Sequence, residues 1–165
     1  MFSRSICRVM LRDLASLRAE IESYPDEQSI WALSSGISNS AGTLALHLCG
    51  NLQHYVGAQL GATGYVRDRA AEFSRRDVPR AELLEQIAAA ATAVETTMPV
   101  DAATLERTFP EEIGGHVVAT RDFLVHLTTH LAYHLGQVDY HRRITTGIDS
   151  PLPRMAIAPL RSERS

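Results

Sequence analysis

Four of the seven histidines lie in one stretch, His126-Leu-Thr-Thr-His130-Leu-Ala-Tyr-His134-Leu-Gly-Gln137-Val-Asp-Tyr-His141. They recur at steps of four, four and seven residues, which return to nearly the same face of an α-helix. Measured from His130 at about 100° per residue, the other three lie within about 40° and Gln137 within about 20°. The stretch therefore predicts a long helix with one row of imidazoles.

This row runs along the edge of an apolar stripe formed by Phe123, Leu127, Leu131 and Val138. Imidazoles that enter a core need polar partners, because an unpaired buried polar group costs free energy. A metal ion is one such partner, since neutral imidazole binds zinc, nickel, copper and iron. Hydrogen-bonded core histidines are the structural alternative.

A second helix, predicted over residues 40–60, repeats this pattern. His47, Asn51 and His54 fall within about 60° of arc beside an apolar stripe. A histidine from a second helix is thus available to complete a site. Gly50 and Gly57 cost roughly 1 kcal/mol each relative to alanine inside a helix, which indicates either close packing or room for a ligand.

The other long apolar periodicities predict helices over residues 2–23, 79–97 and 116–146. Residues 25–39, 62–79 and 99–114 are expected to be connections, the last with a short helical turn near 102–107. The mixed charges of residues 67–77 favour a solvated surface over an anion site. We predict an all-α protein, a four-helix bundle over residues 1–147 with an extended C-terminal tail over 148–165.

Composition excludes several classes of protein. Hydrophobic residues make up 45% of the 165 residues, which supports one folded domain. The net charge of −3 provides no general attraction for nucleic acid, and no apolar run reaches the length of a membrane span. Cys7 and Cys49 form no CxxC motif, so we expect a reduced, cytoplasmic protein.

Two histidines at i and i+4 and a third from a facing helix make a three-nitrogen site with an open coordination position. A cation there lowers the pKa of a bound water or holds a thiol as its thiolate. His130 to His134 lacks the glutamate of HExxH proteases, and GxSxG, P-loop and EExxH motifs are absent. Cys49 lies about 160° from the His47 face and is not expected to be a ligand.

Two segments carry a family resemblance: Asn39-Ser-Ala-Gly-Thr-Leu-Ala-Leu-His47-Leu-Cys-Gly-Asn51-Leu-Gln-His54 and His130-Leu-Ala-Tyr-His134-Leu-Gly-Gln137. The second resembles the H-x-x-x-H-x-G-Q ending of the DinB/YfiT-like superfamily of metalloenzymes, and the likeness spans roughly residues 3–147. It implies an up-down-down-up bundle, often dimeric, that binds zinc or nickel through His47, His130 and His134. Characterised relatives include thiol-cofactor S-transferases and a mycothiol-dependent maleylpyruvate isomerase.

The function predicted on this basis is metal-dependent activation of a small thiol cofactor or of water, for transfer to or hydrolysis of a small-molecule substrate. His54, Asn51 and Gln137 are the candidate catalytic residues, with a packed histidine and buried amides as the structural alternatives. His141 lies roughly 10 Å beyond His134 along the helix, too far to bind the same ion. The rival prediction is a metal-binding or stress-associated bundle without turnover.

Overall fold

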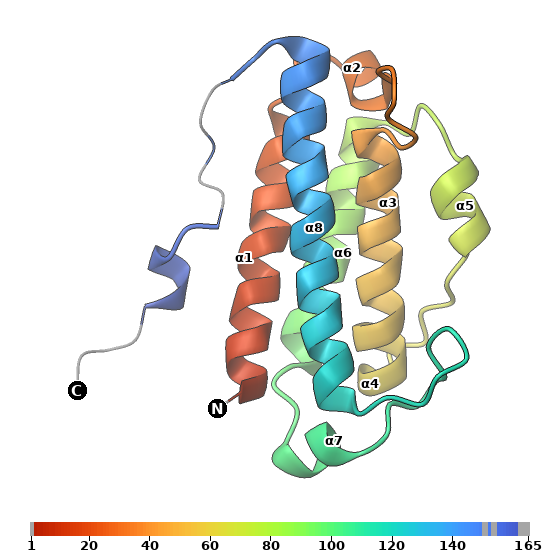
Figure 1. Cartoon of the computed structure of the whole chain (residues 1–165), viewed down its shortest axis with the longest axis vertical. Coiled ribbons are helices and arrows are strands. Elements are labelled where there is room, and N and C mark those ends of the chain that lie inside the picture. The colour runs from red at the N-terminus through yellow and green to blue at the C-terminus, as the bar shows by residue number, and fades with distance from the viewer. Residues whose placement is uncertain (1, 150–151, 153–154, 162–165) are drawn as a thin grey trace.

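The computed structural model describes residues 2–149, 152 and 155–161. Long helical segments pack side by side with the up-down-down-up directions expected of the bundle (Figure 1). In chain order they are α1 (Phe2–Glu22), α3 (Ala41–Leu52) continued by the π-helix η1 (Gln53–Ala58) and α4 (Gln59–Gly61), α6 (Arg80–Thr97) and α8 (Thr120–Thr146). The predicted four-helix bundle is confirmed.

The apolar stripes of these helices meet in one core, because each helix presents leucine, isoleucine or valine at spacings of three and four. The most deeply buried aliphatic side chains come from all four segments: Leu14, Leu17, Leu48, Leu52, Leu83, Val94, Leu124 and Leu131. A fully buried ion pair also joins α1 to α8, where Nε of Arg142 lies 2.7 Å from Oε2 of Glu20. The core thereby fixes the faces that α3 and α8 turn toward each other.

Two short helices lie in segments that the sequence analysis assigned to loops. α2 (Glu27–Trp31) begins after Asp26, whose side chain accepts a hydrogen bond from the backbone N–H of Ser29 at 2.7 Å. α5 (Arg69–Ser74) begins after Asp68, which accepts from the N–H of Ala71 at 2.9 Å. The prediction of uninterrupted loops was wrong here, because aspartate caps stabilise single helical turns that are too short for periodicity.

The predicted turn in the third connection is present as α7 (Ala102–Glu106). α8, however, begins at Thr120 and not at His116. Antiparallel bridges pair Thr108 with Ala119 and Ile113 with His116, around a turn at Gly114 and Gly115 where both φ angles are positive. The helix starts later because these bridges hold the backbone extended up to Ala119.

The C-terminal tail lies partly outside the described residues, at 150–151, 153–154 and 162–165. Its described part contains a 3-10 turn, η2 (Ala158–Leu160), and touches α1. The guanidinium of Arg8 donates to the carbonyl oxygens of Pro159 at 2.8 Å and Arg161 at 2.7 Å. The division at residue 147 stays a prediction. In the described part of the chain, no helix combines the length and apolar character that crossing a bilayer requires.

Candidate metal centre

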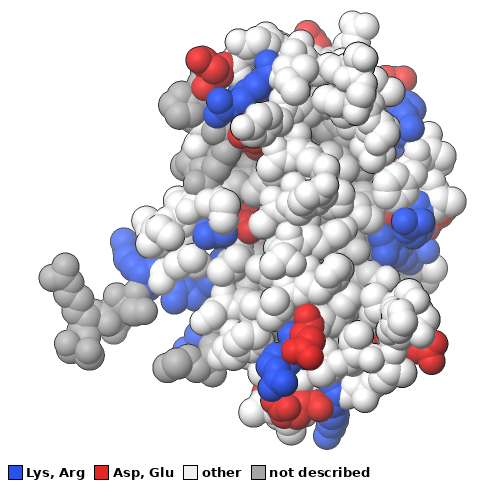
Figure 2. Space-filling model, in the orientation of Figure 1, with Lys and Arg blue, Asp and Glu red and all other residues white. Residues whose placement is uncertain are grey.

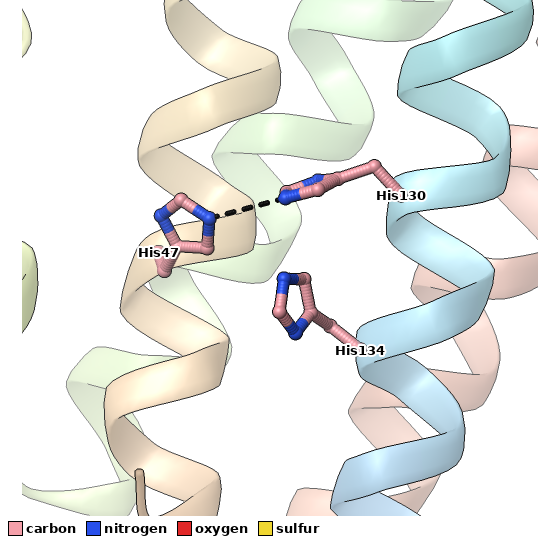
Figure 3. A group of neighbouring side chains, drawn as sticks. All are labelled: His47, His130 and His134. Atoms are coloured by element: carbon pink, nitrogen blue, oxygen red, sulfur yellow. Dashed lines mark hydrogen bonds between the residues drawn. The ribbon is translucent and has the colours of Figure 1, made fainter. Parts of the chain in front are cut away.

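The helices α3 and α8 bring three histidines together at the middle of the bundle. His47 extends from α3, and His130 and His134 extend from successive turns of α8, with their rings directed at one another (Figure 3). Each ring offers one nitrogen, and these three nitrogens lie within 4.8 Å of one another. In the described residues this is the one group of three or more metal-ligating side chains with that geometry. It contains the three ligands that the family resemblance implied.

The ring of His47 is oriented by a carboxylate from α5. Nδ1 of His47 lies 2.9 Å from Oε2 of Glu72, which bonds Arg67 through both carboxylate oxygens at 2.6 and 2.8 Å. Burial raises the pKa of Glu72, but the hydrogen bonds from Arg67 and His47 outweigh it, and the net pKa is lowered. An ionised carboxylate only accepts, so Nδ1 of His47 carries a proton, and in the neutral ring that binds a metal Nε2 would present the lone pair to the centre.

Arg67 and Glu72 belong to the charged run that was expected to be a solvated surface. That expectation was wrong for both residues, since their side chains are only 9% and 6% exposed. Gly50 leaves the space that the carboxylate of Glu72 occupies, because a Cβ at this position would overlap Oε1 of Glu72. Gly57 likewise allows close packing, with Ala93 3.1 Å from where its Cβ would lie. Both glycines therefore allow a close approach of neighbouring side chains.

His134 is oriented in the same way from within its own helix. Its Nδ1 lies 2.6 Å from Oε1 of Gln137, a carbonyl oxygen that can only accept. The proton is therefore on Nδ1, and Nε2 is again left with a lone pair. Burial lowers the pKa of His134 more than its hydrogen bond to Gln137 raises it, so the ring is neutral at pH 7.

His130 completes the group but has no partner of this kind. Its Nδ1 is buried and makes no hydrogen bond to the described residues, and the same is true of Oδ1 of Asn51. Burial, and next the rings of His134 and His47, lower the pKa of His130 to about 4. The ring is thus neutral at pH 7, which is the form that binds metal ions.

The donor set fits a divalent transition metal. Two nitrogens bound tetrahedrally to zinc at about 2.0–2.1 Å lie about 3.4 Å apart, and Nε2 of His47 lies 3.3 Å from Nε2 of His130. Three neutral imidazoles match the ligands of catalytic zinc sites that keep one position open, and they suit nickel equally. The residues present therefore fit the group that the sequence predicted.

The remaining histidines lie outside this group. Nε2 of His54 lies 2.7 Å from Oε2 of Glu111 in the loop before α8, and His54 is two helical turns from His47. The π-helical segment that begins at Gln53 also breaks the uniform 100° step used to place His54. His126 stacks between Phe123 and His130, with centroids 5.8 and 5.9 Å away. A catalytic role for His54 stays a prediction.

Cys49 is fully buried and free, and burial raises the pKa of its thiol. It is absent from the metal-ligating group, as the sequence analysis expected. Glu72 and Arg67 were not predicted to be part of the site. The one indication in the sequence was Gly50, because a glycine inside a helix lowers the stability of that helix.

Helical bundles that bind metal ions do so through side chains that extend inward from facing helices. The three histidines on α3 and α8 are arranged in this way. The family model of mycothiol-S-transferases matches residues 7–147 of the chain. The chain therefore belongs to the mycothiol-S-transferase family, a DinB/YfiT-like metalloenzyme family. No curated protein and no solved structure matches the chain.

Proposed function

We propose that this protein is a metal-dependent S-transferase that joins a low-molecular-weight thiol to a small electrophile. His47, His130 and His134 are the metal ligands in this proposal, and zinc or nickel is the metal. The observation that supports it is the convergence of nitrogens from three imidazole rings. In two of these rings, His47 and His134, the Nδ1 proton is held by Glu72 or Gln137. The family match favours a thiol over water as the activated group.

A divalent cation at this site would hold the sulfur of the thiol as its thiolate at neutral pH. The protein side chains supply orientation. Glu72 and Gln137 hold two imidazoles in the tautomer that presents Nε2, and partners of this type change metal affinity 10- to 100-fold when they are removed. Because Arg67 pairs with Glu72 on both oxygens, the carboxylate cannot rotate away from His47 without breaking a buried ion pair.

Asn51 is the third orienting group in this proposal. Asn51 lies one turn after His47 on α3. Nε2 of His47 in turn lies 3.3 Å from Nε2 of His130 on α8. The Nδ1 donor of His130 and the Oδ1 acceptor of Asn51 are both buried and lack a partner in the described part of the chain. In this proposal Oδ1 of Asn51 accepts the Nδ1 proton of His130 through a bridging water, which leaves Nε2 of His130 to face the metal. Because Asn51→Asp keeps an acceptor and Asn51→Leu does not, only the leucine variant is expected to lose about tenfold in metal affinity. Equal affinities would contradict this role.

The reaction is tested with mycothiol and monobromobimane. The sulfur forms a bond to the bromomethyl carbon, bromide leaves, and the thiol proton passes to solvent. Purified wild-type protein is compared with a His47→Ala/His130→Ala double variant and with His116→Ala, an exposed histidine outside the centre. We expect about one equivalent of metal and metal-dependent conjugation in the wild type and in His116→Ala, and neither in the double variant.

Two outcomes would contradict the proposal. Metal in the wild type without conjugation would favour the rival prediction of a binding protein without turnover. Conjugation at the wild-type rate in the metal-free double variant would exclude the three histidines from the reaction. The predicted homodimer is measured separately by sedimentation of the same samples.

A further inference from the structure

The short helix α5 forms a wall beside the candidate metal centre. It lies next to α3 on the side away from α1 (Figure 1). The ring of Phe73 on α5 contacts the ring of the proposed ligand His47, with centroids 4.8 Å apart and planes tilted by 43°. Phe73 is also partly exposed. It therefore borders both the centre, on the His47 side, and the solvent.

The guanidinium of Arg69 lies over the ring of Phe73, one helical turn away on α5. Its Cζ is 5.1 Å from the ring centroid, which is within the range of an attractive cation–π contact. The two steps, from His47 to Phe73 and from Phe73 to Arg69, put the guanidinium within about 10 Å of the His47 ring. Phe73 thereby holds a positive charge at the edge of the centre.

This positive charge has no counter-ion among the residues that the structure describes. Arg69 is exposed, and its side chain forms neither an ion pair nor a hydrogen bond with them. The nearest acidic groups along the chain are engaged elsewhere. Glu72 pairs with Arg67, and the carboxylate of Asp68 accepts the capping hydrogen bond at the start of α5. Arg69 is therefore a cation that can bind a ligand.

The charges around the centre favour an anion at this position. Figure 2 shows that the face over the middle of α8 is nearly free of charged side chains, whereas basic side chains gather at its edge on the α5 side. Three neutral imidazoles add no charge to the metal, and a thiolate offsets only one charge of a divalent cation. The residual charge of the metal and the guanidinium of Arg69 therefore attract an anionic group together.

We propose that Arg69 binds an anionic substituent of the electrophile and that Phe73 positions Arg69 for this contact. The inference rests on the proposed function, because it names the class of electrophile that the transferase takes. The preferred electrophile carries a carboxylate that a spacer, such as a benzene ring, separates from the reacting carbon. The charged run of residues 67–77, whose pattern favoured a solvated surface, then contains a substrate contact.

Two electrophiles of similar shape, 4-(bromomethyl)benzoate and 4-(bromomethyl)benzamide, separate charge recognition from general activity. In both, the sulfur of mycothiol forms a bond to the benzylic carbon, bromide leaves, and the thiol proton passes to solvent. The preference is the ratio of the two kcat/KM values, each divided by its uncatalysed rate constant. Wild-type protein is compared with Arg69→Gln, Arg69→Lys, Phe73→Leu and the control Arg107→Gln, which removes the same charge from an exposed position outside α5.

The wild type is expected to prefer the carboxylate roughly three- to tenfold, as an exposed ion pair or a hydrogen bond to a charged group would give. Arg69→Gln should lose this preference at an unchanged metal content, and Arg69→Lys should keep most of it because the charge remains. Phe73→Leu should reduce the preference, since the guanidinium loses the ring that positions it. Arg107→Gln should match the wild type.

NMR titration with the unreactive analogues 4-methylbenzoate and 4-methylbenzamide measures the same contact without turnover. We expect the benzoate to bind Arg69→Gln more weakly than the wild type by the same factor, and the amide to bind both proteins equally. A carboxylate that only coordinates the metal would bind both proteins equally, and this result overturns the proposal. Equal preference for the two electrophiles in the wild type, or an equal loss in Arg107→Gln, also overturns it.

The two readouts distinguish this inference from the proposed function. Arg69-dependent binding of the benzoate in a protein that conjugates no electrophile would support the anion contact and reject the transferase. Conjugation with the same preference in the wild type and Arg69→Gln would support the transferase and reject the role of Arg69. An unchanged preference in Phe73→Leu would reject the positioning role of that ring.

Discussion

Replacing Glu72 with glutamine is expected to move one proton in the candidate metal centre. The carboxylate accepts from Nδ1 of His47 at 2.9 Å and from two nitrogens of Arg67 at 2.6 and 2.8 Å. A glutamine has one acceptor oxygen, and the charged guanidinium is the stronger donor for it. The amide NH2 then faces Nδ1 of His47, which must accept. The proton of His47 moves to Nε2, and the lone pair that faces the centre is lost.

The structure sets the size of two separate effects. Loss of a partner that orients a metal ligand costs about 10- to 100-fold in metal affinity, or about 1.4–2.7 kcal/mol. The second effect concerns the metal-free fold, because the side chain of Arg67 is only 9% exposed and loses its counter-ion. Removing one member of a buried ion pair costs about 3–5 kcal/mol. Since the glutamine oxygen still accepts one hydrogen bond, we expect about 3 kcal/mol.

Competition with a chromophoric chelator measures the metal affinity, and urea unfolding of the metal-free protein measures the stability. Glu82→Gln is the matched control, because Glu82 pairs with Arg75 at 2.8 Å while the two side chains are 35% and 43% exposed. An exposed pair contributes about 0–1 kcal/mol, and the control should bind metal normally. A Glu72→Gln protein that is destabilised but binds metal within twofold of the wild type would refute the assignment of the His47 tautomer to Glu72.

Three further substitutions test other contacts. Gly50→Ala is expected to weaken metal binding as Glu72→Gln does, since its Cβ displaces the carboxylate; unchanged affinity in the chelator assay would contradict this. Gly136→Ala should raise the free energy of unfolding by about 0.5–1 kcal/mol, because a Cβ there meets nothing within 4 Å; urea unfolding would expose the error if stability fell. His141→Gln should reduce the loss of stability that occurs as the pH falls below about 6.5. Burial lowers the pKa of His141 more than its bond to Ala32 raises it, so below about pH 6.5 the unfolded chain takes up a proton that the folded chain does not. An equal loss in both proteins would count against a neutral buried His141.

The long helices could be predicted from sequence because their apolar residues recur at the helical period over many turns. The third was expected from Pro79 and begins at Arg80, and the last ends before Gly147 as expected. The short helices α2 and α5 were not predicted, because five or six residues are too few to show a period; α7, which is equally short, was expected only as a helical turn. Their one local signal was an aspartate cap, Asp26 or Asp68, which occurs equally in turns.

The histidine group was predictable because its spacing is local to two helices, whereas the partner of His47 was not. Glu72 lies 25 residues further along the chain, in a segment whose mixed charges are typical of a solvated surface. Only the fold shows that Arg67 neutralises this carboxylate and that both side chains are buried. Gly50 was the indirect clue, because a glycine inside a helix at a cost of roughly 1 kcal/mol indicates a close neighbour.

The charge balance of the centre connects its structure to the proposed thiol chemistry. Three imidazoles bring no negative charge, because neutral rings are the ligand form and the pKa of His130 is lowered to about 4. The charge of Glu72 is already matched by Arg67. The side chains of the centre therefore leave the charge of a divalent cation unbalanced. An anionic sulfur offsets one of the two positive charges, and for this reason the centre favours the thiolate over the neutral thiol.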